Sequence, residues 1–422
     1  MMPSPNQHRI KETINTDVEV TDDGQVRINQ YLVKRYLGCG AYGTVSLAVN
    51  TEDEQEYAIK EFSKLKLRKL EQSRSVSVGP GRGRGWGARR AMRGRGMPMG
   101  CGPPATVGPA ATPATSNPPH PLDPIKREVA IFKKLQHPNI VKLFEVLNDP
   151  DNDCLYMVYE MCHRGPIMDI ALDKACEPYP VDVCRNYFQQ ALLGMEYLHE
   201  NGIIHRDIKP DNLLLDCHGT LKIVDFGVSE MFTPKNTSPS TIATANLADG
   251  VKANAGSPAF MAPELCRAHH GEVSGVKADI WALGVTLYCL ALGQLPFTGR
   301  SVPDMYEAIV AAPLTVPDTL DADLRDLLGR ILDKNPESRL TLMDIRHHPW
   351  TTNHGQRPLA SFDDNCKDVI TEITEHDIQN AIKTIGNLAT VLKAVHLFKA
   401  RHRWSKQPQA SDLSADAEET PE

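Results

Sequence analysis

Residues 203–227 read IIHRDIKPDNLLLDCHGTLKIVDFG, and this stretch constrains the fold and chemistry of the chain more than any other. Four residues follow one another in the order that a phosphoryl-transfer site requires: Asp207, Lys209, Asn212 and Asp225. Such a site orients a hydroxyl, neutralises phosphate charge and does little covalent chemistry of its own. Asp207 can accept the hydroxyl proton, and Lys209 can neutralise the moving phosphate. Asn212 and Asp225 can supply oxygen ligands to Mg²⁺.

The bland alternative is an acidic loop in which Asp and Asn simply form turns between two strands. That alternative leaves the matching motifs on either side of the stretch unexplained. Upstream, Gly38, Gly40 and Gly43 form a G-x-G-x-x-G loop between two segments that alternate as strands do. Glycine lets the backbone approach phosphate oxygens. A strand follows this loop, whereas a helix follows the similar loop of dinucleotide-binding folds.

A lysine at the end of an apolar strand needs a partner for its charge, and Lys60 stands in that position. Glu128, in the helix predicted from Ile125 onwards, is the expected partner. Together these motifs resemble the catalytic core of the eukaryotic protein kinases, and Lys209-Pro210-Asp211-Asn212 resembles their serine/threonine branch. The resemblance implies an α+β, bilobal protein-kinase fold with a β-rich small lobe and a mainly helical large lobe. It also implies the cofactors ATP and Mg²⁺, with Lys60 on the nucleotide phosphates.

Residues 155–162, LYMVYEMC, resemble the hinge of that family. The resemblance makes Tyr159 the gatekeeper and places the backbone groups of Glu160 and Cys162 at the adenine edge. Three apolar side chains are expected to enclose the base: Val45, Ala58 and Leu214.

The resemblance also assigns supporting roles in the large lobe. Asp279 is expected to brace the catalytic-loop backbone, and Arg339 to form a buried ion pair with Glu264. A hydrophobic spine is expected from Phe132, Leu143, His205 and Phe226. The activation segment places 34 residues between Gly227 and Ala262. Its Ser/Thr-rich middle, residues 232–249, is a hypothetical site of phosphorylation. Arg206 is the side chain that would bind the phosphate group once it is attached.

Composition divides the chain into segments. Residues 73–122 hold ten Gly, nine Pro and seven Arg but no acidic residue, which predicts a disordered insertion. The expected organisation is a flexible arm over 1–28, a kinase domain over 29–350 containing that insertion, a helical autoinhibitory and calmodulin-binding segment over 368–406, and an acidic disordered tail over 407–422.

The whole-chain composition narrows the class of protein. Of its 422 residues 41% are hydrophobic, and the net charge of −7 argues against a nucleic-acid partner. Ten cysteines without a C-x-x-C pair favour a reducing compartment, so we expect a cytoplasmic protein, with the nucleus as an alternative. Neither a secretory signal nor a lipid-anchor motif is expected. Residues 280–299 lack charge over a membrane-span length, but a buried helix ending near Gly293 is predicted instead.

Motifs outside the shared core resemble the calcium/calmodulin-dependent protein kinase kinases. These motifs are Asn29-Gln30-Tyr31, the insertion, His137-Pro138-Asn139, Gly165-Pro166-Ile167-Met168, residues 256–264, residues 333–339 and His348-Pro349-Trp350. The resemblance implies substrates that are other kinases, of the calmodulin-dependent and AMP-activated types. It implies that the insertion helps to engage them. This chain departs from the family in its glycine-rich insertion, its long activation segment, and Ser257 where Thr is usual.

The C-terminal segment has the pattern of a basic amphipathic helix, opening with a capping box at Thr374-Glu375-His376-Asp377. Large apolar residues recur at helical spacing among lysines and arginines up to Trp404. That pattern suits calmodulin and, equally, a membrane surface. A helix packed permanently on the large lobe is a further alternative. The family resemblance favours autoinhibition by its first part and calmodulin binding by its second.

Three other functions are weighed. A calmodulin-independent upstream kinase of AMP-activated kinase would share the whole catalytic core. A pseudokinase scaffold predicts damage to the catalytic residues, but Lys60, Asp207, Asn212 and Asp225 are all intact. RNA binding through Arg82-Gly83-Arg84-Gly85 is the third, and a basic arm for acidic protein surfaces is preferred to it.

Overall fold

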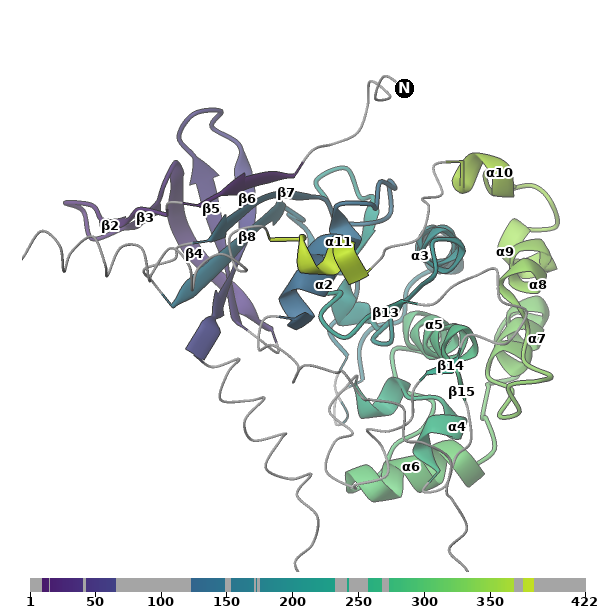
Figure 1. Cartoon of the computed structure of the whole chain (residues 1–422). Coiled ribbons are helices and arrows are strands. Elements are labelled where there is room, and N and C mark those ends of the chain that lie inside the picture. The colour runs from purple at the N-terminus through teal and green to yellow at the C-terminus, as the bar shows by residue number, and fades with distance from the viewer. Residues whose placement is uncertain are drawn as a thin grey trace, which may run out of the picture.

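The computed structural model describes residues 10–14, 16–40, 43–65, 123–148, 153–170, 172, 175–231, 241–242, 257–267, 273–367 and 375–382. A twisted sheet forms one part of the molecule, and a group of helices forms the other (Figure 1). This is the two-lobed α+β arrangement that the sequence predicts. The predictions for the insertion 73–122, for residues 383–406 and for the tail 407–422 concern residues outside the described part of the chain.

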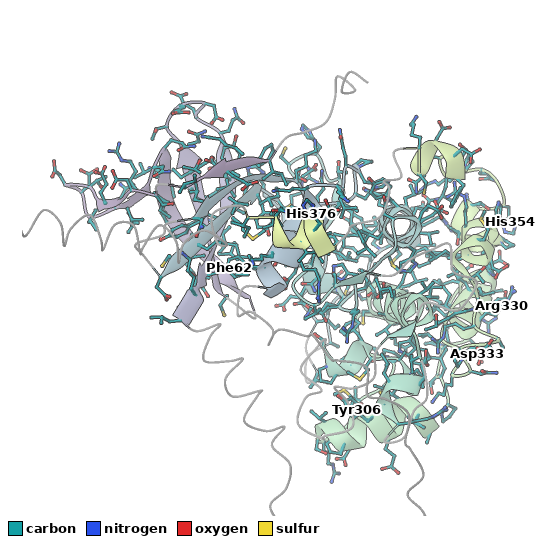
Figure 2. The ribbon with its side chains drawn as sticks, viewed as in Figure 1. Phe62, Tyr306, Arg330, Asp333, His354 and His376 are labelled. Carbon is teal, nitrogen blue, oxygen red and sulfur yellow. The ribbon has the colours of Figure 1, made fainter. Side chains whose placement is uncertain are left out.

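The small lobe is an eight-stranded sheet in the order β1-β7-β8-β6-β5-β4-β3-β2. Its strands are β1 (Lys11–Thr13), β2 (Val18–Val20), β3 (Val26–Ile28), β4 (Tyr31–Gly40), β5 (Gly43–Asn50), β6 (Glu56–Ser63), β7 (Leu143–Asn148) and β8 (Cys154–Glu160). Alternation along β6 puts Ile59 into one apolar cluster and Phe62, labelled in Figure 2, into another. Lys60 faces the same side as Phe62, and that side holds the catalytic residues.

The expectation of a flexible arm over residues 1–28 is wrong for its described part. Three short strands extend the sheet there, and β1 pairs in parallel with β7. The anchor is Glu145, a buried carboxylate on β7 that accepts hydrogen bonds from Tyr31 (2.7 Å), Gln30 (3.1 Å) and Thr13. Lys11 adds an ion pair at 3.2 Å. A polar segment is ordered because a buried charge in the sheet requires these donors.

Helix α2 (Asp123–Phe132) packs against the sheet and carries Glu128. Ile125, Val129 and Phe132 are buried, as their helical spacing predicts. The chain then runs through Ile140, which forms a parallel bridge to Ile223 of the large lobe. Strand β7 therefore begins only at Leu143, because Ile140 and Val141 pair with Ile223 of the other lobe.

The large lobe is built around α3 (Val181–Glu200) and α5 (Gly275–Leu292). Its other helices are α4 (Pro263–Cys266), α6 (Val302–Ala311), α7 (Ala322–Ile331), α8 (Leu342–His347), α9 (Pro349–Thr352) and α10 (Phe362–Asn365), with 3₁₀ turns at Pro210–Asn212 and Pro258–Phe260. Its short strands are β9 (Gly165–Pro166), β10 (Ile203–Ile204), β11 (Leu213–Leu215), β12 (Leu221–Ile223), β13 (Glu230–Met231), β14 (Thr241–Ile242) and β15 (Val273–Ser274).

Helix α5 is the uncharged stretch whose length matches a membrane span. It is apolar enough to cross a membrane by composition alone, but 78% of that window is buried inside the protein. The Ser274 hydroxyl accepts from the Lys277 amide at its start, and Gly293 ends it with φ of 68°. A side chain at Gly293 would also collide with the Cys176 carbonyl. The predicted buried helix ending near Gly293 is confirmed.

A last helix, α11 (Glu375–Gln379), lies against α2 of the small lobe (Figure 1). It belongs to the segment 368–406, for which the sequence predicts a helix. Ile378, Ala381 and Ile382 are buried in the cluster that includes Ile125 and Val129. The described part of the C-terminal segment is therefore packed on the small lobe.

Candidate active site

The catalytic loop follows β10 and is held from below by α5. Asp279 is buried, and its carboxylate accepts hydrogen bonds from the backbone N–H groups of His205 and Arg206, both at 2.8 Å. Arg206 has φ of 70°, which is a strained conformation for a residue with a side chain. The Asp279 bonds stabilise that turn, which is the bracing role expected from the sequence.

The three predicted catalytic side chains lie together, with Lys209 and Asn212 both in contact with the carboxylate of Asp207. Asp207 Oδ2 accepts a hydrogen bond from Asn212 Nδ2 at 2.8 Å and lies 2.9 Å from Lys209 Nζ. Asp207 Oδ1 accepts from the Ser257 amide at 2.9 Å, and Lys209 donates to the Ser257 hydroxyl at 2.6 Å. The Asp207 carboxylate is thereby fixed in orientation, as a proton acceptor for a substrate hydroxyl must be.

A second charged group joins the two lobes. Lys60 Nζ lies 3.3 Å from Glu128 Oε1 and 3.0 Å from Asp225 Oδ1. Burial lowers the pKa of Lys60, but the two carboxylates more than offset this, so the net pKa lies above its ordinary value. Burial raises the pKa of Asp225, and Lys60 outweighs that effect, so the net pKa lies below its ordinary value. Lys60 and Asp225 are therefore both charged at neutral pH.

Tyr159 contributes a contact that the sequence reasoning did not foresee. Its hydroxyl donates to Glu128 Oε1 at 3.0 Å, so the oxygen facing Lys60 has a second partner. The ring of Tyr159 packs edge-on against Phe132, with centroids 5.3 Å apart. Sequence reasoning placed Tyr159 only as the gatekeeper. The signal available was a tyrosine hydroxyl in an apolar strand, which needs a buried partner.

The hydrophobic spine expected across the lobes is present. The Phe226 ring centroid lies 4.9 Å from that of Phe132 and 5.0 Å from that of His205. Leu143 is buried in the same cluster. His205 Nδ1 accepts from the Asp207 amide, which leaves Nε2–H to donate to the Val224 carbonyl at 3.0 Å. The catalytic loop, the strand before Asp225 and helix α2 are thus locked to one another.

The glycine-rich loop is a hairpin of β4 and β5 in which Gly38 faces Val45 and Gly40 faces Gly43. Residues 41–42 at its tip lie outside the described part of the chain. A Cβ on Gly43 would lie 1.7 Å from the Glu61 carbonyl oxygen, so packing alone requires glycine there. A Cβ on Gly38 would meet nothing within 4 Å. Packing does not explain glycine at that position, whereas a phosphate group approaching the backbone does.

The residues assigned to the adenine site come from three places. Val45 pairs with Lys60 across β5 and β6, and Ala58 pairs with Tyr159 across β6 and β8. Leu214 lies on β11 of the large lobe, where it is half-buried. Their roles around a base, and those of the backbone at the hinge, stay predictions.

The hinge itself is stabilised by charge. Glu160 accepts from the Lys142 amide at 2.9 Å and pairs with Lys222 at 3.1 Å, while its own N–H donates to the Lys142 carbonyl. Cys162 is buried, and burial raises the pKa of its thiol to about 12. Both side chains therefore have structural partners, which leaves the backbone as the part of this segment suited to a nucleotide.

The residues present fit a magnesium-bound nucleotide. Asn212 uses its amide nitrogen on Asp207, which turns its amide oxygen away from that carboxylate. The Val224 amide donates to the Asn212 carbonyl at 3.0 Å, so Asp225 follows directly beside Asn212. Amide and carboxylate oxygens suit Mg²⁺, which takes its remaining ligands from water and substrate phosphates. Within the described residues, no three His, Cys, Asp or Glu side chains cluster as a metal site by themselves.

The ion pair predicted to close the activation segment is present. Arg339 is buried and bidentate on Glu264, at 2.7 and 2.9 Å, and it also donates to the carbonyls of Lys277 and Asp333. The activation segment between Met231 and Ser257 lies outside the described residues except for β14. The hypothesis of phosphorylation within residues 232–249 therefore stays a prediction.

Comparison with known proteins agrees with this geometry. Residues 114–351 match the model of the protein kinase domain. The chain is 38% identical over 401 residues to "Calcium/calmodulin-dependent protein kinase kinase cmkC" of Emericella nidulans, covering 93% of this chain and 72% of that protein. It is 35% identical over 421 residues to "Calcium/calmodulin-dependent protein kinase kinase" of Caenorhabditis elegans, covering 98% of this chain and 69% of that protein. A third relative, "Serine/threonine-protein kinase ppk34" of Schizosaccharomyces pombe, is 36% identical over 81% of this chain and 88% of its own length.

Proposed function

We propose that the substrates of this protein are other kinases. The reason is that the chain belongs to the protein kinase family and, within it, to the calcium/calmodulin-dependent protein kinase kinases. The chain is a serine/threonine protein kinase that uses ATP and acts on protein substrates. The finer proposal is that it phosphorylates the activation segments of kinases of the calmodulin-dependent and AMP-activated types. The observation that supports this proposal is the similarity to the Caenorhabditis elegans relative named as a calcium/calmodulin-dependent protein kinase kinase. That similarity covers 98% of this chain and so extends beyond the matched kinase domain, which ends at residue 351.

The geometry supports a simple transfer mechanism. Asp207 accepts the proton of a substrate Ser or Thr hydroxyl as its oxygen attacks the γ-phosphorus of ATP. The bond between that phosphorus and the bridging oxygen breaks, and ADP leaves with the electron pair. Lys60 and Lys209 stabilise the phosphate charge as it redistributes. Mg²⁺, for which Asn212 and Asp225 are the proposed ligands, would neutralise the charge of the phosphate oxygens.

Asp207→Asn tests this mechanism directly. The amide is nearly isosteric but cannot accept the proton, so we expect kcat to fall by roughly 10²- to 10⁴-fold. Lys60 and Asp225 are untouched, so equilibrium binding of a magnesium nucleotide should persist, as measured by fluorescence titration. Turnover at the normal rate would contradict the role of Asp207.

The substrate proposal is tested by radiolabelling. Kinase-dead calmodulin-dependent kinases and kinase-dead AMP-activated kinase are incubated with the protein and ATP, with and without calcium-loaded calmodulin. We expect phosphate on their activation segments, located by mass spectrometry, and none with the Asp207→Asn variant. Transfer to generic peptides without transfer to any of these kinases would remove the substrate proposal but leave the kinase activity intact.

Calmodulin binding is proposed for the second part of the segment 368–406. The support is its basic, amphipathic pattern together with the printed names of two relatives. Calorimetry with calcium-loaded calmodulin, on the whole chain and on a peptide of residues 378–406, is the test. Absence of binding to both would favour the alternative of a calmodulin-independent upstream kinase of AMP-activated kinase.

Two further proposals concern the insertion and the compartment. Residues 73–122 are proposed to dock substrate kinases. Their deletion should slow phosphorylation of kinases more than of short peptides, whereas a loss of RNA crosslinking would support the RNA-binding alternative. A cytoplasmic location, with entry into the nucleus as the alternative, is proposed from the cysteine pattern and is tested by imaging the tagged protein.

A further inference from the structure

Helix α2 carries Glu128 towards the active site, and its C-terminal end contacts other segments of the chain. Glu128 reaches Lys60 at 3.3 Å. At the C-terminal end of the helix, Lys133 and Lys134 continue the chain and contact segments from both ends of the sequence. In Figure 1, α11 lies across α2, and Figure 2 labels His376 on that helix. The segments that contact this end of α2 can therefore decide where Glu128 stands.

Lys133 joins three parts of the chain through one ammonium group. Its Nζ donates to the Ala381 carbonyl at 2.6 Å and pairs with Glu12 Oε1, also at 2.6 Å. Glu12 lies on β1, which is paired to β7. The Lys133 and Glu12 side chains are each about three-quarters removed from solvent, at 28% and 27% exposure. Partial burial makes these contacts stronger than an ordinary surface pair.

Two further contacts fix α11 on the same end of α2. Lys134 Nζ pairs with Asp377 Oδ2 at 2.8 Å. Below the charges, Ile378, Ala381 and Ile382 are buried with at most 7% exposure. Removing these apolar side chains from water stabilises the docked position of α11. The ion pair adds register, because it aligns one turn of α11 with the end of α2.

The Lys60–Glu128 pair depends on where α2 lies. A contact of 3.3 Å is already at the long end of hydrogen-bonding range, so a shift of α2 by about 1 Å would break it. The described chain before α2 ends at Leu65, and the helix begins at Asp123. Among the described residues, β1 at the edge of the sheet and α11 outside the sheet both contact the C-terminal end of α2, and both lie beyond the matched residues 114–351.

We propose that β1 and α11 form a brace on α2, and that Lys133 is its positioning residue, acting on phosphoryl transfer through Glu128. Residues 375–382 therefore raise kinase activity. This is the opposite sign from the autoinhibition that the family resemblance implies for the start of the segment 368–406. Any inhibitory part then begins after Ile382. The inference depends on kinase activity alone and is independent of calmodulin binding and of the substrate kinases.

Lys133→Met in the full chain is the first test, since it keeps the aliphatic stem and removes the ammonium. Initial rates of ADP formation are measured with ATP, Mg²⁺ and a mixed Ser/Thr peptide library. We expect kcat to fall about fivefold, with KM for ATP within about twofold, because Lys60 still contacts Asp225 when Glu128 is displaced. Lys133→Arg retains the donors and should restore most of kcat. Amide hydrogen exchange across α2 should be faster in Lys133→Met and normal in Lys133→Arg.

A charge exchange separates bracing from general damage. Lys134→Glu should lower kcat, and adding Asp377→Lys should recover it, because the ion pair is rebuilt in reverse. The matched control is Lys367→Glu, which breaks an ion pair of 3.3 Å with Asp364 on α10, away from α2, and should leave kcat unchanged. This comparison does not depend on whether Lys133→Met folds well.

The sign of the effect decides the inference. Lower kcat in Lys133→Met and Lys134→Glu, with recovery in the exchanged pair and an unchanged melting temperature, supports the brace. Higher or unchanged kcat in these variants overturns it, and a rise would mean that α11 inhibits. Failure of calmodulin to bind, or of kinase substrates to be labelled, would overturn the proposed function and leave this result standing.

Discussion

Tyr159, Glu128, Lys60 and Asp225 form a continuous line of hydrogen bonds and ion pairs from strand β8 of the small lobe to the segment after β12 of the large lobe. Burial raises the pKa of the Glu128 carboxyl, while the Lys60 ammonium and the Tyr159 hydroxyl oppose that rise. A buried carboxylate without donors would take up a proton and release its lysine. The Tyr159 hydroxyl is therefore part of what keeps the Lys60–Glu128 pair ionised.

Tyr159→Phe removes only that hydroxyl. A hydrogen bond to a charged group contributes about 1.5–3 kcal/mol, so we expect a loss of stability of that order in urea unfolding, together with a several-fold fall in kcat/KM for ATP. Tyr57→Phe is the control, since its hydroxyl donates to Asp53 at 2.9 Å in a solvent-exposed hydrogen bond. If both variants show the same stability in urea and the same kcat/KM for ATP, the Tyr159 hydroxyl does not stabilise the Lys60–Glu128 pair.

At the scale of elements, two of the glycines in the β4–β5 hairpin, Gly38 and Gly43, are there for different reasons. Gly43 has no room for a side chain, because the Glu61 carbonyl of β6 lies against it. Gly38 has room on every side within the described protein. Strand packing thus requires glycine at position 43 but not at position 38, where we expect a nucleotide phosphate to approach the backbone.

Alanine substitutions should separate these two reasons. Gly43→Ala forces β5 away from β6, and we expect it to cost more than about 2 kcal/mol in stability. Gly38→Ala should leave the melting temperature unchanged and raise KM for ATP several-fold. Thermal melts with and without magnesium-ATP measure both effects. A Gly38→Ala variant with normal KM would mean that phosphates do not approach this part of the hairpin.

Helices α4 and α5 are tied to the turn after α7 by Arg339. The guanidinium is fully buried, is bidentate on Glu264 and lies over the Trp281 ring at 5.1 Å. Removing one member leaves the other as a buried, unpaired charge. The ion pair therefore secures the end of the activation segment to the core of the large lobe.

Arg339→Met should destabilise the protein by about 3–5 kcal/mol in urea unfolding, because Glu264 is left without its partner. Adding Glu264→Met should recover part of that loss, since no charge then remains buried. If the double variant proves as unstable as both single losses combined, the pair does not act as a unit.

At the scale of the whole molecule, residues 137–141 attach the small lobe to the large one. His137 stacks on Tyr197 of α3, with centroids 4.8 Å apart, and its Nε2 bonds Asn365 of α10 at 2.9 Å. Its Nδ1 accepts from the Asn139 amide, which fixes the neutral tautomer with Nε2–H. Ile223 exchanges backbone hydrogen bonds with Asn139 and Val141. The junction between the lobes is therefore rigid while His137 is neutral.

Burial lowers the pKa of His137, and this predicts an acid-sensitive junction. The folded pKa lies below the unfolded value of about 6.5, so the neutral histidine stabilises the fold above that pH. This contribution is lost as pH falls below about 6.5 towards the folded pKa. Melting temperatures from pH 7.5 to 5.5 should fall more steeply for the natural protein than for His137→Gln. Parallel curves for the two proteins would remove His137 as the cause.

The catalytic contacts were predictable because they depend on local motifs. Asp207, Lys209 and Asn212 lie within one loop, and Asp225 follows 13 residues after Asn212, so their order in the chain almost places them. The pair Lys60–Glu128 was expected from a buried charge that needs a partner, and the pair Arg339–Glu264 from the family resemblance. The two-lobed fold was expected from the family resemblance, and the alternating pattern of the segments around the glycine-rich loop agrees with its β-rich small lobe.

The contacts that hold β1 and α11 in place were not predictable, because they join segments that are far apart in the sequence. Thr13 and Glu145 are separated by 132 positions, and Lys133 and Ala381 by 248. No local pattern in polar residues 11–28 marks three short strands, so a flexible arm was the expectation. Only the folded sheet provides the buried carboxylate that orders this segment.

The three-way contact at Lys133 has a practical consequence for engineering. Glu12 Oε1 and the Ala381 carbonyl oxygen each lie 2.6 Å from Lys133 Nζ. A short peptide linker could therefore join residues near 10 and 382 and give a circularly permuted kinase that opens at a surface loop elsewhere. Short of permutation, a donor–acceptor dye pair at these two positions would report the seating of α11 as an optical signal. The proposed brace thus also provides a position at which docking of α11 on α2 can be measured by fluorescence.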